Sequence, residues 1–88
     1  MILGKKVMCE DLVVGKVKEI IIDASKMKIT HLEVELASDA AEIALGVRKG
    51  GIINLLAISA LDSIGRTINL KVTKGQLHIY LQAPKLEN

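Results

Sequence analysis

The sequence predicts a single, mainly β domain built from short aliphatic strands. The chain has 88 residues, half of them are apolar although Tyr80 is the only aromatic residue, and seven glycines punctuate short apolar runs. A chain of this length has room for one hydrophobic core and no second domain. We therefore expect residues 1–88 to form one small β-barrel of about five to six short strands with one short helix.

Five segments carry the apolar patterns typical of strands. They are residues 5–9, 14–22, 27–36, 51–55 and 67–72. The second and third segments form the clearest unit, because the polar turn at residues 23–26 joins them as a hairpin. The expected cross-strand pairs are Lys16 with Glu35, Val17 with Val34, Lys18 with Glu33, and Ile22 with Ile29.

This register has one defect. It turns Glu19 toward the apolar face of the hairpin and sets His31 beside Ile20 on the mostly polar face. A buried carboxylate without a partner is costly, so we expect a bulge or an end of the pairing near residues 19–30.

Residues 38–45 predict the short helix. The segment is rich in alanine, with Ser38 as the expected N-cap and with Asp39 and Glu42 near the positive end of the helix dipole. Gly46 follows, and glycine commonly ends a helix in the left-handed conformation.

Several of these segments resemble the PRC-barrel family. The similar stretches are residues 2–7 (ILGKKV), 14–23 (VGKVKEIIID), 28–34 (KITHLEV) and 58–70 (ISALDSIGRTINL). The resemblance spans about residues 2–72 and leaves residues 73–88 as a C-terminal extension or a final strand or helix. It implies a small, strongly bent β-barrel.

The resemblance also implies a function. PRC-barrels are chiefly non-enzymatic adaptors, and short stand-alone archaeal members take part in cell division with the tubulin-like FtsZ ring. Because this chain is similar to that group in its length, the resemblance implies a homodimer or polymer that binds other division proteins. A ribosome-maturation factor is another relative of this kind, so an RNA- or ribosome-associated factor is the alternative.

The charge pattern argues against a nucleic-acid face. The formal net charge is only +2, two of the twelve basic residues are Arg, and aromatic residues for base stacking are almost absent. Residues 29–45 carry acids but no Lys or Arg, whereas residues 46–88 are net basic, and that basic part is what favours the RNA alternative.

No pattern predicts an enzyme, a cofactor or a metal site. Cys9, His31 and His78 do not stand at metal-ligand spacing, and the glycines of residues 46–51 lead into a strand rather than into the helix that a phosphate loop requires. Glu33 and Glu35 share a strand face, but lysines are their expected partners. We therefore predict no catalytic residues and no small-molecule substrate.

The same composition predicts a cytoplasmic protein without a membrane span. The longest apolar stretch, residues 52–61, is interrupted and shorter than the roughly 18 residues that a spanning helix needs. The N-terminus places apolar residues before its lysines, the reverse of a secretory signal. Cys9 is unpaired, as is normal for a cytoplasmic thiol.

Two segments are the expected protein interfaces. Leu77, Ile79 and Leu81 alternate as an edge strand would, whereas Leu77, Tyr80 and Leu81 fit one face of a helix, and the sequence leaves both alternatives open. An edge strand of this kind pairs readily with another chain. Ile43 and Leu45 on the short helix form the second candidate surface.

Overall fold

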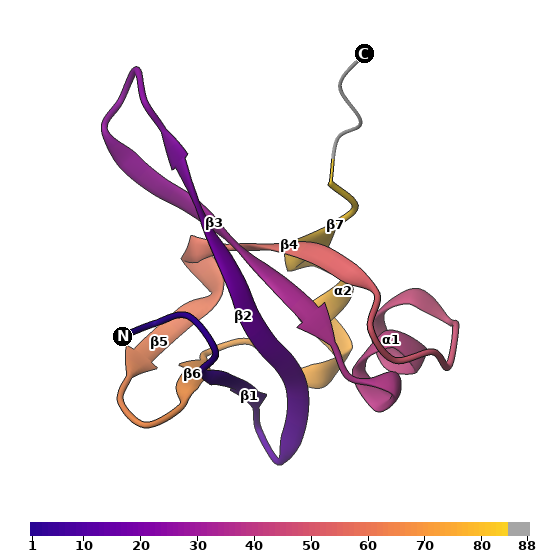
Figure 1. Cartoon of the computed structure of the whole chain (residues 1–88). Coiled ribbons are helices and arrows are strands. Elements are labelled where there is room, and N and C mark those ends of the chain that lie inside the picture. Colours follow the sequence, from indigo (N-terminus) through magenta and orange to yellow (C-terminus); the bar gives the residue numbers. More distant parts are fainter. Residues whose placement is uncertain (85–88) are drawn as a thin grey trace.

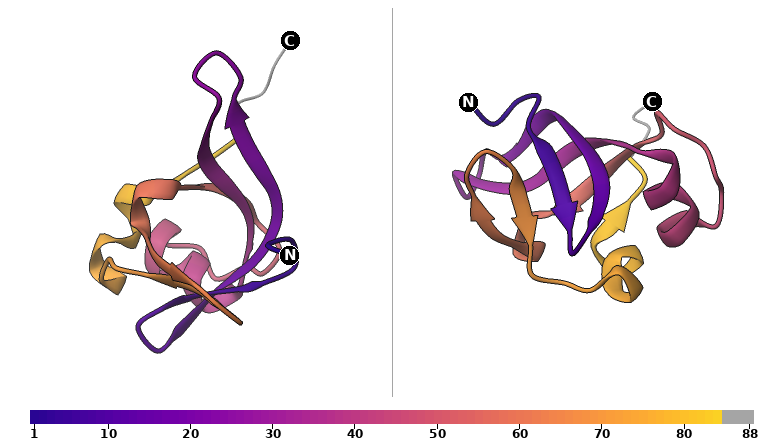
Figure 2. Two further views of the ribbon diagram at one scale, coloured as in Figure 1. Left: turned by 90° about the vertical axis from the view of Figure 1, so that its left-hand side faces the viewer. Right: turned by 90° about the horizontal axis from the view of Figure 1, so that it is seen from below.

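The computed structural model describes residues 1–84 and shows one curled sheet of seven strands (Figure 1). The spatial order is β5-β6-β1-β2-β3-β4-β7. The strands are β1 (Lys6–Cys9), β2 (Leu12–Asp23), β3 (Lys28–Leu36), β4 (Ile53–Ala57), β5 (Leu61–Ile64), β6 (Ile68–Leu70) and β7 (Leu81–Gln82). Figure 2 shows the sheet curling into a half-barrel, which confirms the predicted mainly β fold.

Short helices lie between and after the strands. They are α1 (Ser38–Leu45), α2 (Leu77–Tyr80) and the 3-10 turns η1 (Ile58–Ala60) and η2 (Lys74–Gln76). The longest of these has eight residues, and none in the described part of the chain has the length and apolar character needed to cross a membrane.

The predicted helix is confirmed, but its predicted N-cap is wrong. Ala37 is the N-cap residue, because its N–H donates to the Val14 carbonyl oxygen at 2.9 Å and holds Ala37 in extended backbone, so that Ser38 is already helical. Gly46 ends the helix as expected, with φ of 75° and an N–H that donates to the Glu42 carbonyl oxygen at 3.0 Å.

The hairpin of β2 and β3 contains two irregularities. Lys16 lies opposite Glu35, Val17 opposite Val34 and Ile22 opposite Ile29, as predicted. The predicted pair of Lys18 with Glu33 is wrong, because the register shifts between Val17 and Glu19 and sets Glu19 opposite Glu33. This shift, as expected for a bulge, turns Glu19 away from the apolar face. A second shift, between Ile21 and Ile22, leaves His31 opposite Ile21 rather than beside Ile20.

The hairpin is longer than the strands that flank it. β2 has 12 residues and β3 has 9, whereas β4 has 5 and pairs with β3 only from His31 to Glu35. On the other side, β1 pairs with β2 only from Leu12 to Lys16. Residues 19–30, called the arm below, therefore project from the rest of the domain, called the body (Figure 1).

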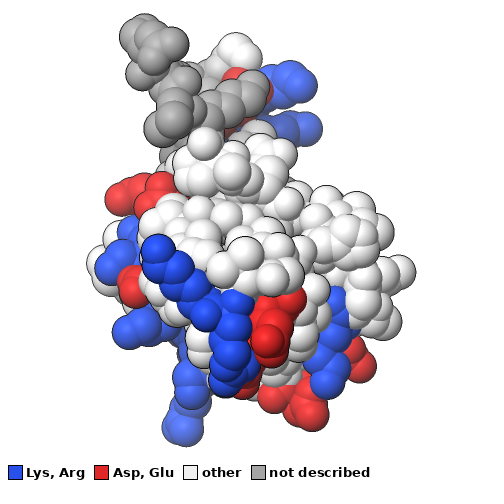
Figure 3. All heavy atoms as spheres, turned by 90° about the vertical axis from the view of Figure 1, so that its right-hand side faces the viewer, with Lys and Arg blue, Asp and Glu red and all other residues white. Residues whose placement is uncertain are grey.

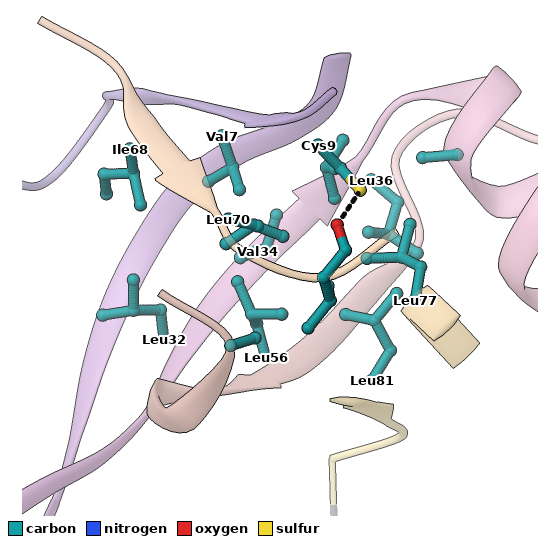
Figure 4. Close-up of a cluster of buried hydrophobic side chains, with 14 of the residues drawn as sticks. Val7, Cys9, Leu32, Val34, Leu36, Leu56, Ile68, Leu70, Leu77 and Leu81 are labelled. Carbon is teal, nitrogen blue, oxygen red and sulfur yellow. Dashed lines mark hydrogen bonds between the residues drawn. The ribbon is translucent and has the colours of Figure 1, made fainter. Parts of the chain in front are cut away.

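The body encloses an aliphatic core. Figure 4 shows its side chains converging from the curled sheet and from α2. The labelled members are Val7, Cys9, Leu32, Val34, Leu36, Leu56, Ile68, Leu70, Leu77 and Leu81. The Cys9 thiol donates to the Val72 carbonyl oxygen at 3.2 Å, which links the end of β1 to the segment between β6 and η2. Asn54 is the one buried polar residue of the described chain, and its Oδ1 has no partner there.

The C-terminal segment combines the two alternatives left open by the sequence. One helical turn, α2, begins directly after η2, and β7 then pairs its two residues with Leu55 and Leu56 of β4. Thr73 and Gln76 form a capping box before α2. β7 is thus an edge strand of two residues, which offers little backbone to another chain.

Candidate protein-interaction surfaces

The predicted interface residues divide between the surface and the core. Ile79 is 64% exposed, and Ile43 and Leu45 are exposed as well. Leu77 and Leu81 do not lie on the surface: they are buried, because the turn of α2 directs both side chains into the barrel. Tyr80 is half-buried and packs against the core.

Exposed apolar side chains on the two helices, named the helical patch below, are Ile43, Leu45 and Ile79. α1 and α2 contact each other, and α1 buries Ala40 and Ala41 while Ile43 points away from the core. Figure 3 shows the side of the molecule that carries α1, where uncharged surface fills much of the centre and charged side chains gather below it.

Ion pairs join the loop that follows α1 to the helix itself. Arg48 Nη1 lies 2.6 Å from Asp39 Oδ1 and 3.2 Å from Glu42 Oε1. The hydrogen bond to Asp39, followed by the Asp39 charge, raises the pKa of the Arg48 guanidinium. The glycines of this loop lead into β4, so the loop does not open a helix as a phosphate-binding loop would.

The arm is a second apolar surface, which the sequence reasoning missed. Ile22, Met27 and Ile29 are exposed, and Ile22 lies opposite Ile29 on the face that continues the core side of the hairpin. The register expected from the sequence gives the hairpin one polar face and one apolar face that can enter a core. The length of the two predicted strands was an available signal, because the other expected strands are about half as long and cannot cover them.

Hydrogen bonds fix the turn at the tip of the arm. Asp23 Oδ1 accepts from the Ser25 hydroxyl at 2.7 Å, from the Ser25 N–H at 3.0 Å and from the Lys26 N–H at 3.3 Å. These bonds favour the ionised form and lower the pKa of Asp23, with the Ser25 side chain as the largest cause. Met27 then adopts φ of 53°, a left-handed conformation uncommon for a non-glycine residue.

The outer face of β1, β2 and β3 carries two like-charge pairs. Lys6 lies directly opposite Lys16, and Glu19 directly opposite Glu33. Lys18 lies between them on β2, and its Nζ is 3.5 Å from Oε1 of Glu35, which lies directly opposite Lys16 on β3. Like charges directly opposite each other in a sheet are destabilising, and only the basic pair has an oppositely charged cross-strand neighbour, Glu35, to offset part of this repulsion.

A groove of about 450 Å³ lies beside the two lysines. Most of its lining is uncharged, and Glu35 is its only acidic residue. The lining residues are Lys6, Val13, Gly15, Lys16, Glu35, Leu36, Ala37, Gly50 and Gly51.

The titratable residues weighed for catalysis form no metal-binding cluster in the described chain. Within residues 1–84, no three His, Cys, Asp or Glu side chains come together in a way that would hold a metal ion. His31 Nδ1 lies 2.9 Å from Thr30 Oγ1, and His78 is exposed on α2. Burial, and secondarily the Glu10 charge, raises the pKa of Cys9, so its thiol stays protonated and is a poor nucleophile.

The fold and its surfaces define a small, curled β domain with a projecting arm, uncovered aliphatic side chains and a paired charge pattern on its outer face. Comparison of the chain with models of known protein families found no match. A comparison with curated proteins found no matching relative either.

Proposed function

We propose that the protein is a non-enzymatic interaction adaptor that self-associates and holds another protein on its arm. The observation that carries this proposal is the arm itself. A two-stranded hairpin without packing on its apolar face is only marginally stable in water, and the exposed Ile22 and Ile29 gain free energy when a partner covers them. The helical patch gives a second uncovered surface, as an adaptor with two partners requires.

The resemblance to stand-alone archaeal PRC-barrel proteins supports a setting for this adaptor. In this proposal the protein acts in the cytoplasm, is recruited to the division site and binds a component of the tubulin-like FtsZ ring. The segments on which the resemblance rests contribute to β1, β2, β3, β5 and β6 of the curled sheet.

An arm variant tests the proposal. In Ile22→Asp/Ile29→Asp, two charges replace the exposed isoleucines, and in the control Ile64→Asp a charge replaces an exposed isoleucine of β5 in the body. When each protein is immobilised on an affinity column, wild type and control should retain the purified tubulin-like division protein, whereas the arm variant should not. The arm variant should still have the oligomeric mass of the wild type in light scattering. Equal retention by the arm variant would contradict the arm as the partner site, and a strictly monomeric wild type would contradict self-association.

RNA binding is the second candidate, and the cross-strand pair of Lys6 and Lys16 favours it. Two adjacent lysines attract phosphate, and an affinity that rests on such contacts falls steeply with salt. Binding of structured RNA should then weaken from about 0.05 M to about 0.2 M salt and disappear in Lys6→Glu/Lys16→Glu. Absence of binding at the lower salt would exclude this candidate.

A further inference from the structure

None of the four residues in the two like-charge pairs forms an ion pair within the described chain, although Lys16 has Glu35 as its neighbour on β3. The four ion pairs formed among residues 1–84 involve none of Lys6, Lys16, Glu19 and Glu33. Lys6, Lys16 and Glu19 are exposed and Glu33 is half-exposed, so all four can reach a partner. A partner that neutralises both pairs must therefore present acidic and basic groups side by side.

Both pairs lie on one face of the sheet. Val17 and Val34, whose buried side chains point into the barrel, lie opposite each other between the two pairs. Three residues along a strand cover about 10 Å, so Lys16 and Glu19 occupy adjoining parts of β2. Lys18 lies between the basic pair and the acidic pair on β2 and forms an ion pair with Glu35, which lies beside Lys16.

The face carries two spots of opposite charge, the basic pair (Lys6 and Lys16) and the acidic pair (Glu19 and Glu33). Such a face is complementary in charge to the same face of a second copy. Consider a two-fold axis that lies in the plane of the face, midway between the basic pair and the acidic pair and perpendicular to the line that joins them. This axis places the basic pair of each copy over the acidic pair of the other. Such an isologous contact is the commonest arrangement in homodimers. An unrelated partner would need the same two charges at the same spacing, whereas a second copy supplies them by symmetry.

The groove adds an apolar part to this contact. Val13 and Ala37 line it beside the two lysines. Ile21 is half-buried and lies on the outer face two residues after Glu19, where it pairs with His31. When Glu19 of one copy approaches Lys16 of the other, Ile21 is the apolar side chain that follows it toward the groove.

We propose that two copies of this chain bind through this outer face, with Lys6 and Lys16 of each copy facing Glu19 and Glu33 of the other. This inference rests on the self-association included in the proposed function and assigns it a surface. The arm's inner face and the helical patch lie outside the contact and stay open to another protein.

Charge reversal tests the contact. Lys6→Glu/Lys16→Glu makes both spots acidic, and Glu19→Lys/Glu33→Lys makes both basic. Each double variant should raise the dimer Kd at least about tenfold, because like charges then meet across the interface. An equimolar mixture of the two should recover a 1:1 heterodimer, and the quadruple variant, in which the two spots are exchanged, should dimerise like the wild type. Sedimentation velocity measures each mass.

A control variant and the salt dependence complete the experiment. Lys26→Glu/Lys71→Glu changes the net charge as much as the first variant does but lies outside the contact, so it should leave the Kd unchanged. The wild-type dimer should weaken between about 0.05 M and about 0.5 M salt. A wild-type dimer that both double variants retain would overturn this contact and leave self-association standing, whereas a monomeric wild type would overturn both. Failure of the mixture to form a heterodimer would also overturn it.

Discussion

The arm and the body use the same hairpin in opposite ways. On β2, Ile20 and Ile22 share a face, and Ile20 lies opposite Leu32 of β3. Leu32 is 1% exposed and Ile22 is 60% exposed, although both belong to this one apolar face. The difference shows that strand alternation selects the face, whereas the neighbouring strands and helices decide how far along that face the core extends.

The largest expected effect comes from truncating matched residues in the two regions. Leu32→Ala should lower the free energy of unfolding by about 2–5 kcal/mol, because it opens a cavity in a closed core. Ile22→Ala should lower it by less than about 1 kcal/mol, because little of that side chain is removed from water. Urea denaturation of both variants measures the two values, and equal losses would show that the arm is packed like the body.

A glycine in the body gives the next effect. A Cβ at Gly15 would overlap the Glu35 carbonyl oxygen, so Gly15→Ala must push β2 and β3 apart. We expect a loss of about 3 kcal/mol. Gly65→Ala is the control, because a Cβ there meets nothing within 4 Å and its φ is not in the left-handed region. Thermal unfolding of the two variants should separate them clearly, and a fully stable Gly15→Ala would contradict the close approach.

The body also contains a residue whose replacement should be stabilising. Asn54 is 4% exposed, and its Oδ1 has no hydrogen-bond partner within the described residues. Asn54→Leu keeps the branching and the number of side-chain heavy atoms; it removes the unpaired Oδ1 together with the 2.9 Å hydrogen bond from Nδ2 to the Ile53 carbonyl oxygen, and should raise the free energy of unfolding by about 1 kcal/mol. Asn54→Ala should not be stabilising, because it leaves a cavity. A destabilised leucine variant in urea denaturation would show that the amide is satisfied.

The smallest effect is the acid response of the arm's turn. The hydrogen bonds from Ser25 and Lys26 lower the pKa of Asp23, so the stabilisation they give is present above about pH 3.9, the value for an unfolded Asp. It is lost as the pH falls through the lowered pKa of the folded state. The Ser25 and Lys26 amide signals should shift in that acidic range in NMR spectra.

Asp11 in the body provides the comparison for this titration. Its pKa is also lowered, but chiefly by the Lys74 side chain, 2.8 Å away. Added salt should therefore move the Asp11 transition toward its ordinary pKa and leave the Asp23 transition nearly in place, because salt screens an exposed ion pair more than a turn hydrogen bond to the backbone and a hydroxyl. Equal salt shifts at both positions would contradict the assigned causes.

Local patterns were enough to predict much of the fold. The helix bounds, Gly46 as its end and the pairs at Lys16 and Val17 follow from neighbouring residues in the sequence. β5 escaped prediction because three of its four residues are exposed, so it lacks the apolar pattern of a strand and is defined by its pairing with β6. β7 is only two residues long and depends on β4 for its existence.

The candidate surfaces were harder to predict, because each depends on a displacement of one residue or one turn. A helical turn at α2 moved Leu77 and Leu81 into the core while Ile79 stayed outside. A bulge of one residue set Glu19 opposite Glu33, where the sequence pattern had placed Lys18. Such shifts come from the packing of the whole barrel, and the alternation of residue types does not reveal them.

The parallel pairing of β1 with β6 has a consequence for the synthesis of this protein. Val7 pairs with Ile68 and Met8 with Asn69, and the Cys9 thiol reaches the Val72 carbonyl oxygen. The first strand leaves the ribosome early, but the strand that seals its free side emerges about sixty residues later, or about 3–12 s at ordinary elongation rates. During that interval the hairpin of β2 and β3 is available to pair with β1, so we expect the nascent chain to wait as a three-stranded meander and to close only after β6 has emerged.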